Sequence, residues 1–180
     1  MALIDFDKCQ RLRGRGYRGN VGRKLAYLYD DKVWMVKFPR TTKNMTGKHL
    51  PSYTSSPLSE YVGSQIYKLL GIPVHETVLG KCESKIVVGC RDFTDMGDLL
   101  EYSQIKNMVY DEFISGSYGS SGKGERLNDV IRVIETSEEF EGLRDDVRQR
   151  FWDMFVIDTF IHNNDRNNGN FVSLHFSYHL

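Results

Sequence analysis

Two short apolar runs near the N-terminus, KLAYLY at 24–29 and VWMVKF at 33–38, limit the folds open to this chain more than any other feature. Aromatic and β-branched residues alternate in both runs, and the polar stretch Asp30-Asp31-Lys32 separates them. Alternation around a polar turn predicts a β-hairpin. We therefore expect a small sheet to begin before the first helix.

A helix with recognisable ends is predicted after the hairpin, in the segment LSEYVGSQIYKLLG at 58–71. Its apolar residues, among them Val62 and Leu69, recur at helical spacing. Ser59 is the expected N-terminal cap and Gly71 the expected stop. The stretch 40–58, rich in Ser and Thr, predicts a long loop before this helix.

The remaining predicted elements change from strands to helices along the chain. Strands are predicted at 76–82 and 85–93, and helices at 127–135 and 143–161, after a Gly/Ser-rich loop at 114–125. This order indicates an α+β fold, with a small antiparallel sheet and one helix followed by a helical lobe. We expect an N-terminal domain at 1–93 and a C-terminal domain at 94–180.

Composition narrows the class of protein. The 180 residues are 40% hydrophobic and 27% charged, which is typical of a soluble globular protein of one domain or two small lobes. No run of about 18 apolar residues predicts a membrane span, and the N-terminus lacks the apolar core of a signal peptide. The odd number of cysteines, three, argues against a disulfide framework. These features favour a cytoplasmic location.

The net charge of zero conceals an uneven distribution. Residues 1–90 carry 15 Lys and Arg against 7 Asp and Glu, a balance of +8, and residues 91–180 carry 9 against 17, a balance of −8. A basic first half favours an anionic ligand such as a nucleotide or a nucleic acid. Opposite charges that help two lobes to associate would produce the same distribution.

The glycines of the stretch GRGYRGNVGRK, at 14, 16, 19 and 22, form the first candidate site. Glycine lets backbone N–H groups approach a phosphate closely, which a Cβ would prevent. These glycines precede a strand, as in a kinase glycine-rich loop, whereas those of a dinucleotide-binding fold open a helix. A flexible basic loop is the alternative interpretation.

Lys37, at the end of the second apolar run, is the second candidate. Its ammonium group needs a partner if the strand is buried. In kinase folds such a lysine binds the α- and β-phosphates and pairs with a glutamate on the next helix. Glu60, in the first turn of the predicted helix, is the available partner. Alternatively, Lys37 extends to solvent at a sheet edge.

The third candidate follows the last long helix, in IHNNDRNNGNF at 161–171. Asp165 and Asn170 have the D-x-x-x-x-N spacing of a kinase catalytic loop, in which the aspartate accepts the hydroxyl proton and the asparagine binds magnesium. A polar helix cap and turn is an equally good interpretation of these residues taken alone. In the C-terminal tail, His175 and His179 complete no recognised zinc pattern.

The glycines, the lysine, the glutamate and the D-x-x-x-x-N motif occur in the chain order that a kinase-like nucleotide site requires. The segments that contain them, together with KIVVGCRDF at 85–93, resemble the HipA-like serine/threonine kinases, and most closely a compact bacterial branch of that family. The resemblance extends from about residue 5 to residue 171.

The resemblance implies a bilobal protein-kinase-like fold, ATP and Mg²⁺ as cofactors, and phosphoryl transfer to a protein hydroxyl. Many members of this family are toxins of toxin–antitoxin pairs, and some phosphorylate aminoacyl-tRNA synthetases. A protein substrate of that kind, or an antitoxin, is therefore the expected partner. Direct nucleic-acid binding and membrane association are not expected.

The resemblance also implies a role for each motif residue of this chain. Gly16, Gly19 and Gly22 would cover the phosphates, and Lys37, oriented by Glu60, would hold them. In the catalytic loop at 162–171, Asp165 would be the base and Asn170 the Mg²⁺ ligand. The backbone at 88–91 would face adenine, and the candidate autophosphorylation sites are Ser55, Ser56 and Ser59.

The sequence departs from the family after Asn170. Relatives continue with a strand and a second metal-binding aspartate, whereas no Asp or Glu follows Asp165 here. Metal ions and positioning supply most of the catalysis in phosphoryl transfer, so the rate is expected to fall by several orders of magnitude. We therefore expect a truncated copy, and the alternative function is a pseudokinase that binds nucleotide or a partner protein without catalysis.

Overall fold

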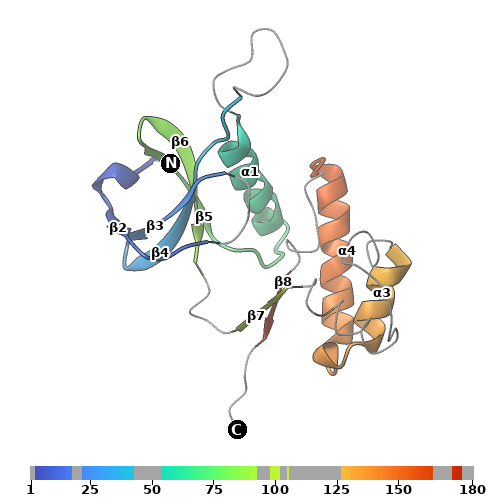
Figure 1. Cartoon of the computed structure of the whole chain (residues 1–180). Helices are drawn as coiled ribbons and strands as arrows, with labels where there is room; N and C mark the ends of the chain where they lie inside the picture. Colours follow the sequence, from blue (N-terminus) through green and yellow to red (C-terminus); the bar gives the residue numbers. More distant parts are fainter. Residues whose placement is uncertain are drawn as a thin grey trace. The chain divides into compact units, whose positions relative to one another are not determined.

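The computed structural model describes residues 3–17, 22–42, 54–92, 98–101, 105, 127–163 and 172–175, with the backbone alone at 98–101 and 172–175. The chain divides into two compact units, residues 1–95 and 96–180, whose elements are labelled in Figure 1. The predicted domain boundary between residues 93 and 94 lies outside the described residues and stays a prediction.

The first unit contains a six-stranded sheet in the order β1-β5-β6-β4-β3-β2. Its strands are β1 (Ile4–Asp5), β2 (Gln10–Leu12), β3 (Lys24–Tyr29), β4 (Lys32–Lys37), β5 (Thr77–Cys82) and β6 (Lys85–Arg91). The predicted hairpin, β3–β4, and the two later strands are confirmed. The sheet is antiparallel as expected except at one edge, where β1 pairs with β5 in parallel.

The N-terminal strands β1 and β2 were not expected from the sequence. A short 3-10 helix, η1 (Phe6–Lys8), joins them and carries the chain from one edge of the sheet to the other. These strands have only two and three residues, too few for an alternating pattern to be recognised. Parallel pairing is open to β1 and β5 because they are far apart in the chain and are not joined by a hairpin.

Two tight turns close the hairpins with residues in the left-handed region. Asp30 and Asp31, between β3 and β4, have φ values of 51° and 53°, and Glu83 and Ser84, between β5 and β6, have 50° and 58°. Positive φ at both positions is the feature of the two-residue turn whose twist matches that of the strands. The carboxylate of Asp7 accepts a hydrogen bond from the backbone N–H of Glu83 at 3.0 Å, which ties η1 to the second turn.

One face of the sheet closes around Phe6, which is completely buried. The ring of Phe6 lies over two glycines of neighbouring strands, Gly80 and Gly89. A Cβ on Gly80 would come within 2.6 Å of both the Ile4 carbonyl oxygen and the Phe6 ring. The other buried members of this core are Tyr27, Trp34, Val36, Phe38, Cys82 and Val87.

Helix α1 (Ser56–Leu69) packs on β5 and β6 (Figure 1). It begins three residues before the predicted cap, with Ser55 as N-cap and Pro57 in the first turn, where a missing N–H costs nothing. Gly71 ends the helix as predicted, since its φ is 71° and the N–H of Ile72 donates to the Tyr67 carbonyl oxygen at 3.0 Å.

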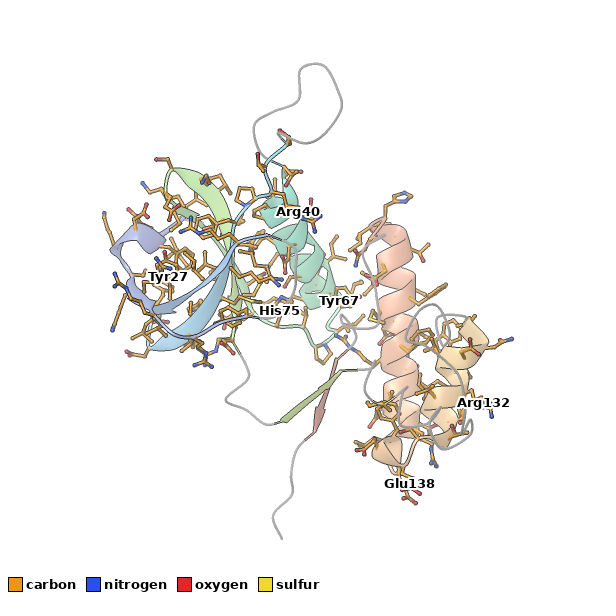
Figure 2. All side chains as sticks on the ribbon, in the orientation of Figure 1. Tyr27, Arg40, Tyr67, His75, Arg132 and Glu138 are labelled. Carbon is orange, nitrogen blue, oxygen red and sulfur yellow. The ribbon has the colours of Figure 1, made fainter. Side chains whose placement is uncertain are left out.

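The buried face of α1 differs from the one its apolar residues suggested. Ser64 and Tyr67 are buried, whereas Val62 and Leu69 are exposed. Ser64 donates a hydrogen bond to the His75 carbonyl oxygen at 3.1 Å, so polar contacts hold part of this helix face. Side chains from the sheet and from α1 fill the space between the two layers (Figure 2).

The second unit contains α3 (Leu127–Thr136), η3 (Glu138–Phe140) and α4 (Arg144–Phe160), and α3 packs on α4. Both predicted helices are confirmed to within a residue at each end. Strands β7 (Asp98–Glu101) and β8 (Val172–His175), which were not predicted, form an antiparallel pair. In the part of the chain that the structure describes, neither α1 nor any other helix has the length and apolarity needed to span a bilayer.

We expect Gly80→Ala to lower the free energy of unfolding by about 1–3 kcal/mol, because the added methyl group overpacks the contact between β1, Phe6 and β5. Urea unfolding followed by circular dichroism measures the change. Gly16→Ala is the matched control, since a Cβ there meets nothing within 4 Å. Equal stability of the two variants would contradict this account of the Phe6 core.

Candidate functional site

Lys37 is the last residue of β4, and its side chain lies on the face of the sheet that α1 covers. Its ammonium group donates a hydrogen bond to Oε1 of Glu60, in the first turns of α1. The two side chains are 28% and 30% exposed. Strand β4 lies between β6 and β3, so Lys37 is not at a sheet edge. The structure therefore brings together the lysine and glutamate that the sequence paired.

A second lysine, Lys24, lies directly opposite Lys37 on the neighbouring strand β3. Burial lowers the pKa of Lys24, and the nearby charge of Lys37 lowers it further. Like charges at directly opposed positions destabilise a sheet. Lys24 and Lys37 bring two ammonium groups to this face of the sheet, where an anionic ligand would interact favourably with their positive charge.

Cys90, on β6, is the third group beside the pair. Val88 is directly opposite Lys37 in the ladder, and Cys90 is two residues further on, so it faces the same side. Its thiol donates a hydrogen bond to Oε1 of Glu60 at 3.4 Å. Burial and the Glu60 carboxylate raise the pKa of the thiol well above its ordinary value, which keeps Cys90 protonated at neutral pH.

The charge state of Lys37 reflects two opposing effects. Burial lowers the pKa of Lys37, but Cys90 and Glu60 raise it by more, so that the net shift is upward. The ammonium form is therefore stabilised in the folded chain. Lys37 stays positively charged at neutral pH, as binding of a phosphate group would require.

The glycine-rich segment connects two antiparallel strands, β2 and β3. A strand, rather than a helix, follows the glycines, and this arrangement agrees with a kinase glycine-rich loop and excludes a dinucleotide-binding turn. Gly16 is exposed, and Gly22 has a φ of 79° that only glycine adopts readily. Gly19 lies outside the described residues.

Two side chains of this segment are anchored to the end of β6. Arg15 forms an ion pair with the buried carboxylate of Asp92, with Nε 3.0 Å from Oδ2, and Tyr17 donates a hydrogen bond to the same oxygen at 2.7 Å. Hydrogen bonds to a buried, charged carboxylate are strong, so they restrict the positions of Arg15 and Tyr17. Asp92 therefore sets where the glycine-rich segment starts relative to the sheet.

The expected adenine-facing backbone at 88–91 lies in the central strand β6. This strand pairs with both β4 and β5 at 88–90, and Arg91 pairs with Trp34 of β4. The N–H of Arg91 donates to the Glu76 carbonyl oxygen at 2.8 Å, and the N–H of Asp92 to that of Val33 at 2.9 Å. The pairing on both sides occupies most hydrogen-bonding groups at 88–90, and the adenine-facing role of this backbone stays a prediction.

Asp165 and Asn170 lie outside the described residues, so their catalytic roles stay predictions. The described end of α4 shows how the chain enters that loop. His162 has a φ of 53°, and the N–H of Asn163 donates to the Asp158 carbonyl oxygen at 2.8 Å. The side-chain amide of Asn163 also donates to the buried carboxylate of Asp158 at 2.9 Å.

These contacts identify residues 162–163 as a polar helix cap, which was the alternative interpretation of the stretch. A cap at this point is compatible with a functional loop after it. Asp158 fixes the direction in which the chain leaves α4, and this residue was not recognised in the sequence.

The candidate autophosphorylation sites lie at the start of α1. Ser55 and Ser59 are exposed, whereas Ser56 is half-buried and its hydroxyl lies 2.9 Å from that of Thr54. Ser59 donates a hydrogen bond to the Ser55 carbonyl oxygen at 3.4 Å. Phosphorylation of these serines stays a prediction.

We expect a double-mutant cycle of Lys37→Met and Glu60→Gln to give a coupling free energy of about 1 kcal/mol, the upper end for pairs that retain some exposure. The pKa of Lys37 is raised on folding. Its stabilisation is therefore complete below the unfolded value of 10.5 and is lost as the pH rises through the folded pKa.

Urea unfolding of the wild type and the three variants measures this coupling, at pH 8 and at pH values above the pKa of lysine in the unfolded chain. Lys32 and Glu76, an exposed pair 3.6 Å apart on the same sheet, provide the control and should show little coupling at 0.5 M salt. A coupling that grows with pH would contradict the assignment.

The chain is similar to serine/threonine-protein kinase CtkA of Helicobacter pylori, with 39% identity over 178 residues, which are 98% of this chain and 51% of the relative. It is also similar to the crystal structure of a proinflammatory kinase CtkA of Helicobacter pylori, with a TM-score of 0.80 and 34% identity, over 98% of this chain and 56% of that one. No protein-family model matches the chain.

The chain thus spans about half the length of the curated relative that it matches. Both matches cover 98% of this chain, and the α+β fold is kinase-like. The similarity falls in the compact branch that the sequence motifs indicated. By sequence and by fold, the chain is similar to the serine/threonine-protein kinase CtkA over nearly all of its own length.

Proposed function

We propose that the first unit binds Mg-ATP and that the protein transfers its terminal phosphoryl group to a serine or threonine hydroxyl of a protein. The observation that carries this proposal is the ion pair between Lys37 and Glu60, which holds a charged ammonium on a rigid central strand. Homology to a serine/threonine kinase supports the same activity.

The surroundings of the pair support a polyphosphate ligand. Lys24 adds a second positive charge directly opposite Lys37, and the glycine-rich segment joins the strand that carries Lys24 to β2. Backbone N–H groups of a glycine-rich loop and lysine ammonium groups are the donors that bind triphosphates in kinases. These residues would hold ATP, and bound Mg²⁺ would neutralise the charge that develops on the phosphates.

Two residues outside the described part complete the proposal. Asp165 would accept the proton of the attacking hydroxyl, and Asn170 would bind Mg²⁺, as the motif spacing indicates. An exposed serine near the start of α1, Ser55 or Ser59, would be a substrate for autophosphorylation.

A second candidate function is nucleotide binding without phosphoryl transfer. The chain spans about half of its kinase relative, and the Lys37–Glu60 pair would bind a nucleotide whether or not phosphoryl transfer follows. Such a protein would bind Mg-ATP through the same lysines and would act through a partner protein.

We expect saturating Mg-ATP to raise the midpoint of thermal unfolding, because a ligand that binds only the folded state stabilises it. Lys37→Ala should weaken Mg-ATP binding about 10- to 100-fold, since it removes a hydrogen bond between charged groups. Lys32→Ala, on the same strand but paired with Glu76, is the control and should bind normally. An unchanged midpoint with Mg-ATP would refute the nucleotide site.

Transfer of ³²P from labelled ATP to the chain itself or to a general protein substrate tests catalysis. We expect Asp165→Asn to reduce the transfer at least about 100-fold, because it removes the proposed base, while Mg-ATP still raises the thermal midpoint. Mass spectrometry of the labelled chain would identify the modified serines. Mg-ATP binding without any transfer by the wild-type chain would favour the second candidate function.

A further inference from the structure

Three side chains that meet at the Lys37–Glu60 pair have the chemistry of a transition-metal site. They are the carboxylate of Glu60, the imidazole of His75 and the thiol of Cys90, and their ligand atoms all lie within 4.8 Å of one another. Thiolate, imidazole and carboxylate are the three ligand types that zinc accepts in proteins. The geometry points to a Zn²⁺ site formed by Glu60, His75 and Cys90.

The spacing of two of these atoms already suits a tetrahedral ion. Bonds of about 2.3 Å to sulfur and about 2.0 Å to oxygen hold the two ligand atoms about 3.5 Å apart. Sγ of Cys90 lies 3.4 Å from Oε1 of Glu60. A nitrogen of His75 lies within 4.8 Å of both atoms, so a small movement of the imidazole would complete three bonds, and the fourth position stays open for water.

Each ligand comes from a different element, and each is held by contacts of its own. Cys90 lies on the central strand β6, which is paired on both sides. The connection that carries His75 is tied to α1 by the hydrogen bond from Ser64 and by one from Gln65 to Thr77 at 3.2 Å. Nε2 of His75 is sealed from solvent. Such preorganisation favours metal binding over a chance cluster.

Metal binding at this site competes with Lys37 for one atom. Oε1 of Glu60, which would coordinate Zn²⁺, is the atom that accepts the hydrogen bond from the Lys37 ammonium group. As Zn²⁺ binds, the Cys90 thiol releases its proton to solvent, a Zn–S bond forms, and the ammonium group dissociates from Glu60. If the proposed kinase function holds, Zn²⁺ would therefore displace the lysine that positions ATP, and the ion would act as an inhibitor.

Binding of Co²⁺ and Zn²⁺ to the nucleotide-free chain tests the site independently of the proposed function. We expect one equivalent of Co²⁺ to produce a thiolate-to-metal absorption band that Cys90→Ser abolishes. Cys9→Ser, which removes a half-buried cysteine on the N-terminal side of β2, should retain the band. Competition with a chromophoric chelator should show Zn²⁺ affinity at least about 100-fold lower in Cys90→Ser and in His75→Gln. His179→Gln, in the C-terminal tail, should bind Zn²⁺ as the wild type does.

The competition with Lys37 has its own measurement. We expect Lys37→Met to tighten Zn²⁺ binding about tenfold, the equivalent of one weak ion pair, because Glu60 is then released from its cation. A site to which Lys37 were irrelevant would show no change, and that result would overturn the competition. Absence of the Co²⁺ band, or its persistence in Cys90→Ser, would overturn the site itself. Neither result depends on whether the chain binds ATP.

Discussion

A lysine on the covered face of a central strand is the constraint on which this structure depends. Lys37 cannot reach solvent at a sheet edge, and an unpaired ammonium group that is largely buried is costly. Its partner, Glu60, lies on α1, so the ion pair fixes the first turns of the helix over the sheet. The helix face that packs on the sheet therefore contains the polar residues Glu60, Ser64 and Tyr67. This face has to neutralise the charge of Lys37 as well as bury side chains.

The sheet itself depends on a separate apolar contact. Phe6 fills the space over Gly80 and Gly89 on the opposite face, where any larger residue would collide with the ring or with β1. The side chains on the two faces of β6 therefore make different kinds of contact. One face supports Phe6 in a tightly packed core, and the other presents Cys90 to the Lys37–Glu60 pair. A strand that alternates in this way can be rigid and still contribute to a polar site.

The elements predicted correctly are those with enough residues for a pattern to be recognised. The hairpin at β3 and β4, the strands β5 and β6, and helices α1, α3 and α4 all have six or more residues with regular spacing. The strands that were not expected have two to four residues. The start of α1 was misplaced because Ser55 and Ser59 are both acceptable caps, although Pro57, which is typical of a first helical turn, favours Ser55.

Sequence alone identified Lys37 and Glu60 as partners. A lysine in an apolar strand needs an opposite charge, and Glu60 is the carboxylate available at the start of the next helix. The pairing of 88–90 on both sides was not expected, because the sequence does not show how many neighbours a strand has. Lys24, His75 and Cys90 are separated from Lys37 by 13 to 53 positions in the chain, and no motif connects them. Strand register and the packing of α1 bring them to one place, since side chains at directly opposed or alternate positions share a face. The sequence therefore determined which residues hold the central charge, and only the tertiary structure decided which groups surround it.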